Sequence, residues 1–151
     1  HLSLRRQRQM CIRDSNQWIK SSSGGQFNKL SMEFLLGQIF RLFAFMIGIN
    51  WNETVLVGSL LGQKFVLNEF IAYVNLAEMK ASGLLSEKSI LISTYALCGF
   101  ANFSSIAIQI GGIGSMAPSR QKDISKLGLR ALLAATLATL LTGNIAGFII
   151  A

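Results

Sequence analysis

Long apolar runs separated by short polar breaks form the main pattern of this chain. In the longest run, from Ser89 to Ser119, no side chain is charged. As one helix this run would be about 46 Å long at ~1.5 Å per residue, whereas the hydrocarbon core of a membrane is ~30 Å thick. Small and polar residues gather in its middle, from Cys98 to Ser105. The pattern predicts two half-helices that meet near the membrane midplane, the second of which ends close to Pro118.

An aromatic-rich segment precedes this run and has the pattern of a helix. Residues 31–49 are apolar around most of the predicted helix. The exceptions fall on one helical face: Glu33, Gly37, Gln38 and Arg41. This pattern predicts an amphipathic helix that lies in the membrane interface, and a further transmembrane span is the alternative. Asn50–Glu53 follows as a polar break, in which Trp51 suits the headgroup region.

Two short apolar stretches come next, and neither is long enough to span a membrane. Thr54–Gly62 and Val66–Val74 flank the polar residues Gln63 and Lys64. This arrangement predicts a re-entrant helical hairpin that has the polar pair at its tip, near the midplane, and both ends on one side. Ala77–Lys88 is predicted to be a polar loop.

The end of the chain combines a basic segment with an apolar one. Four basic residues lie between Arg120 and Arg130, beside the single acidic residue Asp123. Ala131–Ala151 has no charge and is long enough for a final transmembrane helix. The positive-inside rule then places segment 120–130 in the cytoplasm. We therefore expect the hairpin to enter from outside, the broken helix to run inward and the last helix to run outward.

Composition favours a membrane protein over a nucleic-acid binder. Of the 151 residues, 51% are hydrophobic and 14% are charged, whereas soluble domains have about 25% charged residues. The net charge of +7 includes four arginines within the first fourteen positions. Because no basic stripe interleaved with aromatics occurs later, we expect no nucleic-acid partner.

The first 29 residues differ in character from the rest. Residues 4–15 resemble translated sequencing-adapter sequence, and a basic arm or the charged start of a signal peptide are the alternatives. Residues 16–29 are polar and rich in serine and glycine. We therefore expect two regions: a disordered or artefactual segment 1–29 and a transmembrane region 30–151.

Metal sites and histidine chemistry are not indicated. His1 is the single histidine, and Cys11 and Cys98 lack the spacing of metal ligands or of a disulfide framework. The glycines at 111, 112 and 114 lack the lysine of a phosphate-binding loop, and close packing of helices explains them better. We expect no cofactor, no metal and no enzymatic activity.

Two groups of polar residues lie inside the apolar runs. Glu69 stands in the second half of the hairpin, where a charge costs roughly 2.5–3.5 kcal/mol. Such a carboxylate suits sugar hydroxyls or a cation, and an ion pair with Lys64 is the alternative. Near the centre of the broken run, Asn102, Ser104 and Ser105 offer amide and hydroxyl groups, and Asn102 and Ser105 share a helix face. They either bind a ligand, as interrupted helices of transporters do, or hold helices together.

Four motifs resemble the C-terminal part of a bacterial concentrative nucleoside transporter, of the nucleoside:cation symporter family. They are Gly58–Lys64, Asn68–Tyr73, Thr94–Ile106 and Gln109–Gly114. The resemblance covers about residues 30–151, and Arg41 departs from it because relatives often have a proline-containing turn there. It implies an all-α membrane protein, a fragment of an inverted-repeat transporter. Its parts are an interfacial amphipathic helix, a re-entrant helical hairpin, a discontinuous transmembrane helix and a final transmembrane helix.

The resemblance also implies a function and a site. It implies import of nucleosides by alternating access, as a homotrimer in the bacterial plasma (inner) membrane, in contact with lipid. Five residues are implied to bind the substrate: Glu69, Asn102 and Ser105 at the ribose, Phe100 near the break and Val74 beside the base. The coupling ion, Na+ or H+, is expected to bind in a part that precedes this region. A membrane subunit that does not transport, and whose break only packs helices, is the alternative.

Overall fold

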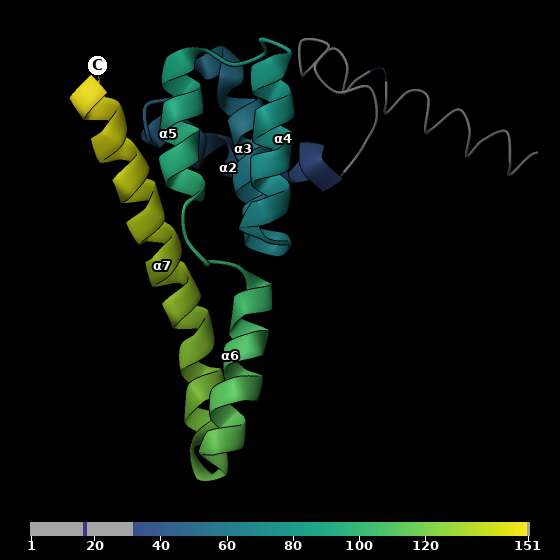
Figure 1. Cartoon of the computed structure of the whole chain (residues 1–151), viewed down its shortest axis with the longest axis vertical. Coiled ribbons are helices and arrows are strands. Elements are labelled where there is room, and N and C mark those ends of the chain that lie inside the picture. Colours follow the sequence, from purple (N-terminus) through teal and green to yellow (C-terminus); the bar gives the residue numbers. More distant parts are fainter. Residues whose placement is uncertain (1–16, 18–31, 151) are drawn as a thin grey trace, which may run out of the picture.

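The computed structural model describes residue 17 and residues 32–150, and every regular element in this part of the chain is helical (Figure 1). The elements are α2 (Met32–Met46), the 3₁₀ turn η1 (Trp51–Glu53), α3 (Thr54–Val66), α4 (Glu69–Ala81), α5 (Glu87–Leu97), α6 (Phe103–Met116), the 3₁₀ turn η2 (Pro118–Arg120) and α7 (Gln121–Ile150). The all-α prediction is confirmed for these residues. The predicted disordered or artefactual segment 1–29 lies outside them, apart from residue 17.

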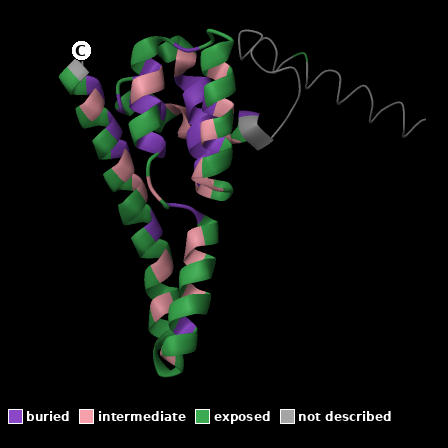
Figure 2. Ribbon diagram, in the orientation of Figure 1, coloured by how far each residue is buried: buried purple, intermediate pink, exposed green. Residues whose placement is uncertain are grey.

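Helices α2 to α5 pack into a bundle, and α6 extends away from it (Figure 1). Helix α7 runs along the whole molecule, contacting α6 with its first part and α5 with its second. Buried residues concentrate in the bundle, whereas the α6–α7 pair is mostly exposed (Figure 2). The apolar core includes Leu60 of α3 together with Ile92 and Leu97 of α5. The break between α5 and α6 therefore lies where the bundle ends.

Glycines allow α2 and α3 to approach closely. A Cβ atom on Gly58 would lie 2.6 Å from the carbonyl oxygen of Gly37, so a larger residue does not fit there. One turn further along α2, Arg41 Nε donates to Thr54 Oγ1 at 3.1 Å. The guanidinium carbon of Arg41 also lies 4.0 Å from the ring centroid of Trp51, in a cation–π contact. The helix face that carries Gly37 and Arg41 thus packs against α3 and η1.

Helices α3 and α4 form a hairpin, but the predicted position of its tip is wrong. Gln63 and Lys64 lie inside α3 and are 5% and 3% exposed. The chain turns instead at Leu67 and Asn68, between the two helices. The polar pair remains helical because its side chains find partners inside the protein, one of which is Asn75 Nδ2, which donates to Gln63 Oε1.

The prediction of an interrupted helix is confirmed, whereas the predicted polar loop is shorter and the last helix begins earlier than expected. Helix α5 ends at Leu97, α6 begins at Phe103, and Pro118 follows the end of α6. The loop predicted at Ala77–Lys88 is reduced to residues 82–86, because α4 continues to Ala81. The basic segment 120–130, which the sequence pattern separates from the last helix, is itself helical: Arg120 ends η2, and residues 121–130 form the first turns of α7.

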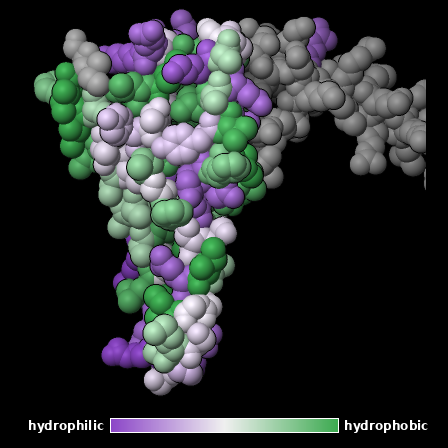
Figure 3. Space-filling view, viewed as in Figure 1, coloured by the Kyte–Doolittle hydropathy of each residue, from purple (hydrophilic) through white to green (hydrophobic). Residues whose placement is uncertain are grey.

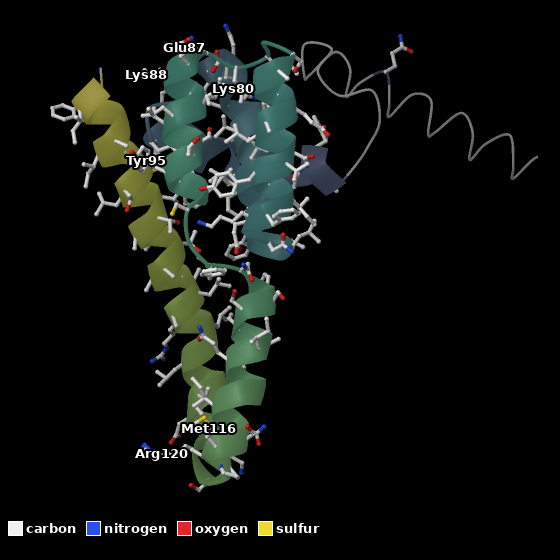
Figure 4. The ribbon with its side chains drawn as sticks, in the orientation of Figure 1. Lys80, Glu87, Lys88, Tyr95, Met116 and Arg120 are labelled. Atoms are coloured by element: carbon white, nitrogen blue, oxygen red, sulfur yellow. The ribbon has the colours of Figure 1, made fainter. Side chains whose placement is uncertain are left out.

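Hydrophilic side chains gather at two ends of the molecule (Figure 3). Lys80, Glu87 and Lys88 lie around the connection between α4 and α5, and Arg120 lies at the opposite end, beside the turn between α6 and α7 (Figure 4). Among the described residues, Pro118–Ile149 is the one helical stretch long and apolar enough to cross a membrane.

Candidate functional site

The candidate site is built around the break between α5 and α6. Within the break, Gly99 has a φ angle of +129°, which residues with a side chain rarely adopt. A Cβ atom on Gly99 would also lie 2.9 Å from Thr139 Cγ2 on α7. Glycine therefore allows both the turn of the backbone and its close approach to α7.

Asn102 caps the start of α6 and joins it to the hairpin. Its Oδ1 accepts hydrogen bonds from the backbone nitrogen of Ser105 at 2.7 Å and from Ser105 Oγ at 2.9 Å. This is how an N-cap residue pairs the free N–H groups of a first turn. Asn102 Nδ2 donates to Glu69 Oε2 at 2.9 Å, and the side chain is buried. The structure thus brings together Glu69, Asn102 and Ser105 as one hydrogen-bonded group.

Glu69 is the first residue of α4, directly after the hairpin tip. Asn68 caps this helix, because its Oδ1 accepts from the backbone nitrogen of Ile71 at 3.0 Å. The N-terminal ends of α4 and α6, which carry partial positive charge, therefore both lie at the carboxylate of Glu69 and stabilise it. Because Glu69 is only partly buried, its carboxylate remains able to accept hydrogen bonds from a ligand.

Lys64 reaches the other side of the break. Its Nζ donates to the carbonyl oxygen of Ala96 and to Thr139 Oγ1, both at 2.9 Å. An ion pair with Glu69, the alternative that the sequence left open, is not formed within the described part of the chain. Sequence reasoning considered Lys64 only as a partner of Glu69 or as a hairpin tip. The feature of the sequence that could have indicated these contacts is a lysine inside a run of apolar residues.

A small cavity of about 100 Å³ lies beside the break. Phe100, Asn102 and Ser105 line it on one side, and Ala131, Leu132 and Ala135 of α7 line it on the other. Phe100 is 78% exposed, so most of its ring is free to contact another molecule.

Val74, the remaining predicted residue, lies on α4, the helix that begins at Glu69. It is exposed on α4 and is not among the residues that line the cavity. The structure therefore groups four of the five predicted residues at the break and places Val74 on the hairpin.

A family profile described as "Na+ dependent nucleoside transporter C-terminus" matches residues 11–147. The chain belongs to this family. The resemblance that the four motifs carried is thereby confirmed. The match begins inside segment 1–29, while the boundary predicted at residue 30 stays a prediction.

Relatives and solved structures agree with this assignment. The uncharacterized transporter YutK of Bacillus subtilis is 52% identical over 121 residues, which cover 80% of this chain and 30% of that protein. The nucleoside permease NupC of Helicobacter pylori is 42% identical over 124 residues, with coverage of 80% and 30%. The structure of CNTnw in an inward-facing substrate-bound state is 39% identical, with a TM-score of 0.75 and coverage of 91% and 34%.

Two conclusions follow from the family. The chain is part of a membrane protein, and its family is one of transporters and not of enzymes. It spans about a third of the length of the relatives that it matches.

Proposed function

We propose that this chain is the C-terminal third of a nucleoside:cation symporter and carries the ribose-binding half of its substrate site. The observation that carries the proposal is the hydrogen-bonded group of Glu69, Asn102 and Ser105. A ribose offers hydroxyl groups that both donate and accept hydrogen bonds. The carboxylate accepts, while the amide and the hydroxyl can do both, so the group matches a sugar.

Phe100 and Val74 complete the proposed site on the side of the base. The exposed ring of Phe100 borders the cavity at Asn102 and Ser105, and an aromatic face packs well on a planar base. Val74 adds an exposed apolar side chain on the hairpin. These two residues provide apolar contacts, which suit a base better than a sugar.

We propose that the elements are arranged around the membrane as the sequence indicates. Helix α2 lies in the interface, α3 and α4 form the re-entrant hairpin, α5 and α6 form the discontinuous span, and α7 is the last transmembrane helix. The basic residues at the α6–α7 end support a cytoplasmic position for that end by the positive-inside rule, and the membrane is the bacterial plasma membrane in this proposal.

The rest of the transport machinery belongs, in this proposal, to the part of the protein outside this chain. That part supplies the base-binding hairpin and the site of the coupling ion. The description of the family supports Na+ as this ion, and H+ is the alternative. The full-length protein works by alternating access and forms a homotrimer surrounded by lipid.

Uptake by the full-length protein tests the proposal. Proteoliposomes containing it should accumulate radiolabelled uridine when an inward gradient of Na+ or H+ is imposed, and not when the gradient is dissipated. If uptake equals that of empty liposomes under both gradients, with uridine, adenosine or cytidine, the alternative of a non-transporting membrane subunit is correct.

A further inference from the structure

Lys64 forms a buried connection between three helices. It belongs to α3 of the hairpin, is 3% exposed, and donates to Ala96 at the end of α5 and to Thr139 on α7. The hydroxyl of Thr139 itself donates to the carbonyl oxygen of Thr136 at 3.0 Å, so it is oriented to accept from Lys64. In each of these three hydrogen bonds an ammonium or hydroxyl group donates and an oxygen atom accepts.

Ala96 lies in the last turn of α5, which explains why its carbonyl oxygen is available to Lys64. An interrupted helix leaves the carbonyl oxygens of its last turn without intrahelical partners, and its C-terminal end carries partial negative charge. A buried ammonium group that donates to such a carbonyl oxygen gives it a partner and also stabilises the negative end of the helix. On the other side of the break, Asn102 caps α6 and binds Glu69. The hairpin therefore holds the interrupted helix at two points, one on each side of residues 98–102.

We propose that Lys64 is a positioning residue of the substrate site, which holds the end of α5 and thereby sets where the break delivers Asn102 to Glu69. This inference rests on the proposed function, because it assigns to Lys64 an effect on substrate affinity. Lys64 acts through the backbone of the break and does not itself contact the nucleoside. Thr139 of α7 accepts a hydrogen bond from Lys64. Its methyl carbon lies 2.9 Å from the point that a Cβ atom on Gly99 would occupy.

Transport kinetics of the full-length protein test the proposal. With Lys64→Met, KM for uridine should rise about five- to a hundredfold, the effect expected when a displaced Asn102 or Glu69 no longer makes a hydrogen bond to the sugar. Vmax per folded transporter should change much less. KM for 2′,3′-dideoxyuridine should change little, because that nucleoside lacks the hydroxyls that Glu69 and Asn102 bind. Lys80→Met, on the exposed side of the same hairpin, is the matched control.

Substitutions at Thr139 make the test independent of whether Lys64→Met folds. Thr139→Val keeps the methyl group but lacks the hydroxyl, so it should raise KM for uridine. Thr139→Ser keeps the hydroxyl, so its KM should stay near the wild-type value. An unchanged KM in both Lys64→Met and Thr139→Val, or an equal rise for uridine and its dideoxy analogue, would overturn the proposal.

Thiol labelling separates this inference from the proposed function. Cys98 lies in the break and is exposed, so in a protein whose other cysteines are serine its maleimide labelling reports on the position of the break. We expect Lys64→Met to change the labelling rate at least about threefold and Lys80→Met to leave it unchanged, even if the wild type transports nothing. An unchanged rate in Lys64→Met contradicts the positioning role, whereas absent wild-type uptake contradicts only the proposed function.

Discussion

Asn102 Nδ2 donates a 2.9 Å hydrogen bond to Glu69 Oε2, across a sequence separation of 33 residues. This bond joins the tip of the hairpin to the start of α6. Because Asn102 also caps α6 through its other amide atom, one side chain links the stability of a helix to the position of a carboxylate. Substitutions at the break can therefore distinguish effects on stability from effects on substrate binding.

Replacing Glu69 should abolish most transport without unfolding the protein. In the full-length protein, Glu69→Gln removes the charge that strengthens hydrogen bonds to the sugar, a contribution of about 1.5–3 kcal/mol. We expect Vmax/KM for uridine uptake to fall roughly 10- to 100-fold, at normal expression. Glu78→Gln, at an exposed position on the same helix, should transport at the wild-type rate. Equal uptake by the two variants would remove Glu69 from the site.

Asn102 and Asn68 provide a matched pair of helix caps. Each caps one helix through its side-chain oxygen, so substitution by alanine should lower the free energy of unfolding by about 1 kcal/mol at Asn68 and by more at Asn102, which also loses its bond to Glu69. Only Asn102 also binds Glu69. We therefore expect a large rise in KM for Asn102→Ala and a small one for Asn68→Ala, measured beside thermal unfolding in detergent.

Asn102→Asp separates the two roles within one residue. Aspartate retains the oxygen that caps α6 but lacks the donor to Glu69, and it places a second carboxylate beside the first. Uptake should be lost, because the donor to Glu69 is gone and the two carboxylates repel each other. Wild-type uptake by Asn102→Asp would show that the bond to Glu69 has no part in transport.

Gly99 should tolerate no side chain. Gly99→Ala combines a φ angle of +129° with a contact of 2.9 Å to Thr139 Cγ2, so we expect it to lose roughly 1–3 kcal/mol of stability. Gly83 has a φ angle of +67° but open space around it, so Gly83→Ala should lose less, by strain alone. Thermal unfolding of both variants measures the difference. A smaller loss of stability for Gly99→Ala than for Gly83→Ala would mean that the break does not pack closely against α7.

The crossing of α2 and α3 gives a further stability test. A Cβ atom on Gly58 would lie 2.6 Å from the backbone oxygen of Gly37, so Gly58→Ala must separate the helices and should cost about 1–3 kcal/mol. Gly112 lies in a helix with open space around it, so Gly112→Ala should be neutral or slightly stabilising. Similar melting temperatures for the two variants would contradict close packing at Gly58.

Residues 30–151 alone should not transport nucleosides, because they hold only part of the proposed site. Vesicles that contain this segment should take up no more uridine than empty vesicles, whereas the full-length protein should accumulate it. Uptake by residues 30–151 alone would show that the site is complete within them.

Deletion of residues 1–15 should leave membrane insertion unchanged, which carbonate extraction of membranes measures.

Several features of the fold follow from the order of residues alone. An uncharged run longer than a membrane is thick, with polar residues from Cys98 to Ser105 at its centre, predicted an interruption, and the structure has it between Leu97 and Phe103. The position of Glu69 among apolar residues marked it as a candidate ligand. The interruption is confirmed, whereas the role of Glu69 stays a prediction. Both rest on the cost of placing charge and free backbone groups in an apolar environment, which depends mainly on local sequence.

The hairpin tip could not be predicted in the same way. Gln63 and Lys64 break the apolar pattern, and a polar break indicates a turn when water is the partner. Here their partners are Asn75, Ala96 and Thr139, up to 75 residues away, so the helix continues through them. Similarly, the basic residues after Arg120 are compatible with either a loop or the first turns of α7.

The sequence by itself determined that this protein is helical, belongs in a membrane and has an interrupted helix with polar residues at the break. These properties arise from hydrophobicity, helix length and charge, which are local. Only the tertiary structure decided that Lys64 binds the end of α5 rather than Glu69, and that Asn102 reaches Glu69 from the start of α6. A hydrogen bond requires its two atoms within about 3 Å, and for residues so distant along the chain the packing of the helices sets that distance.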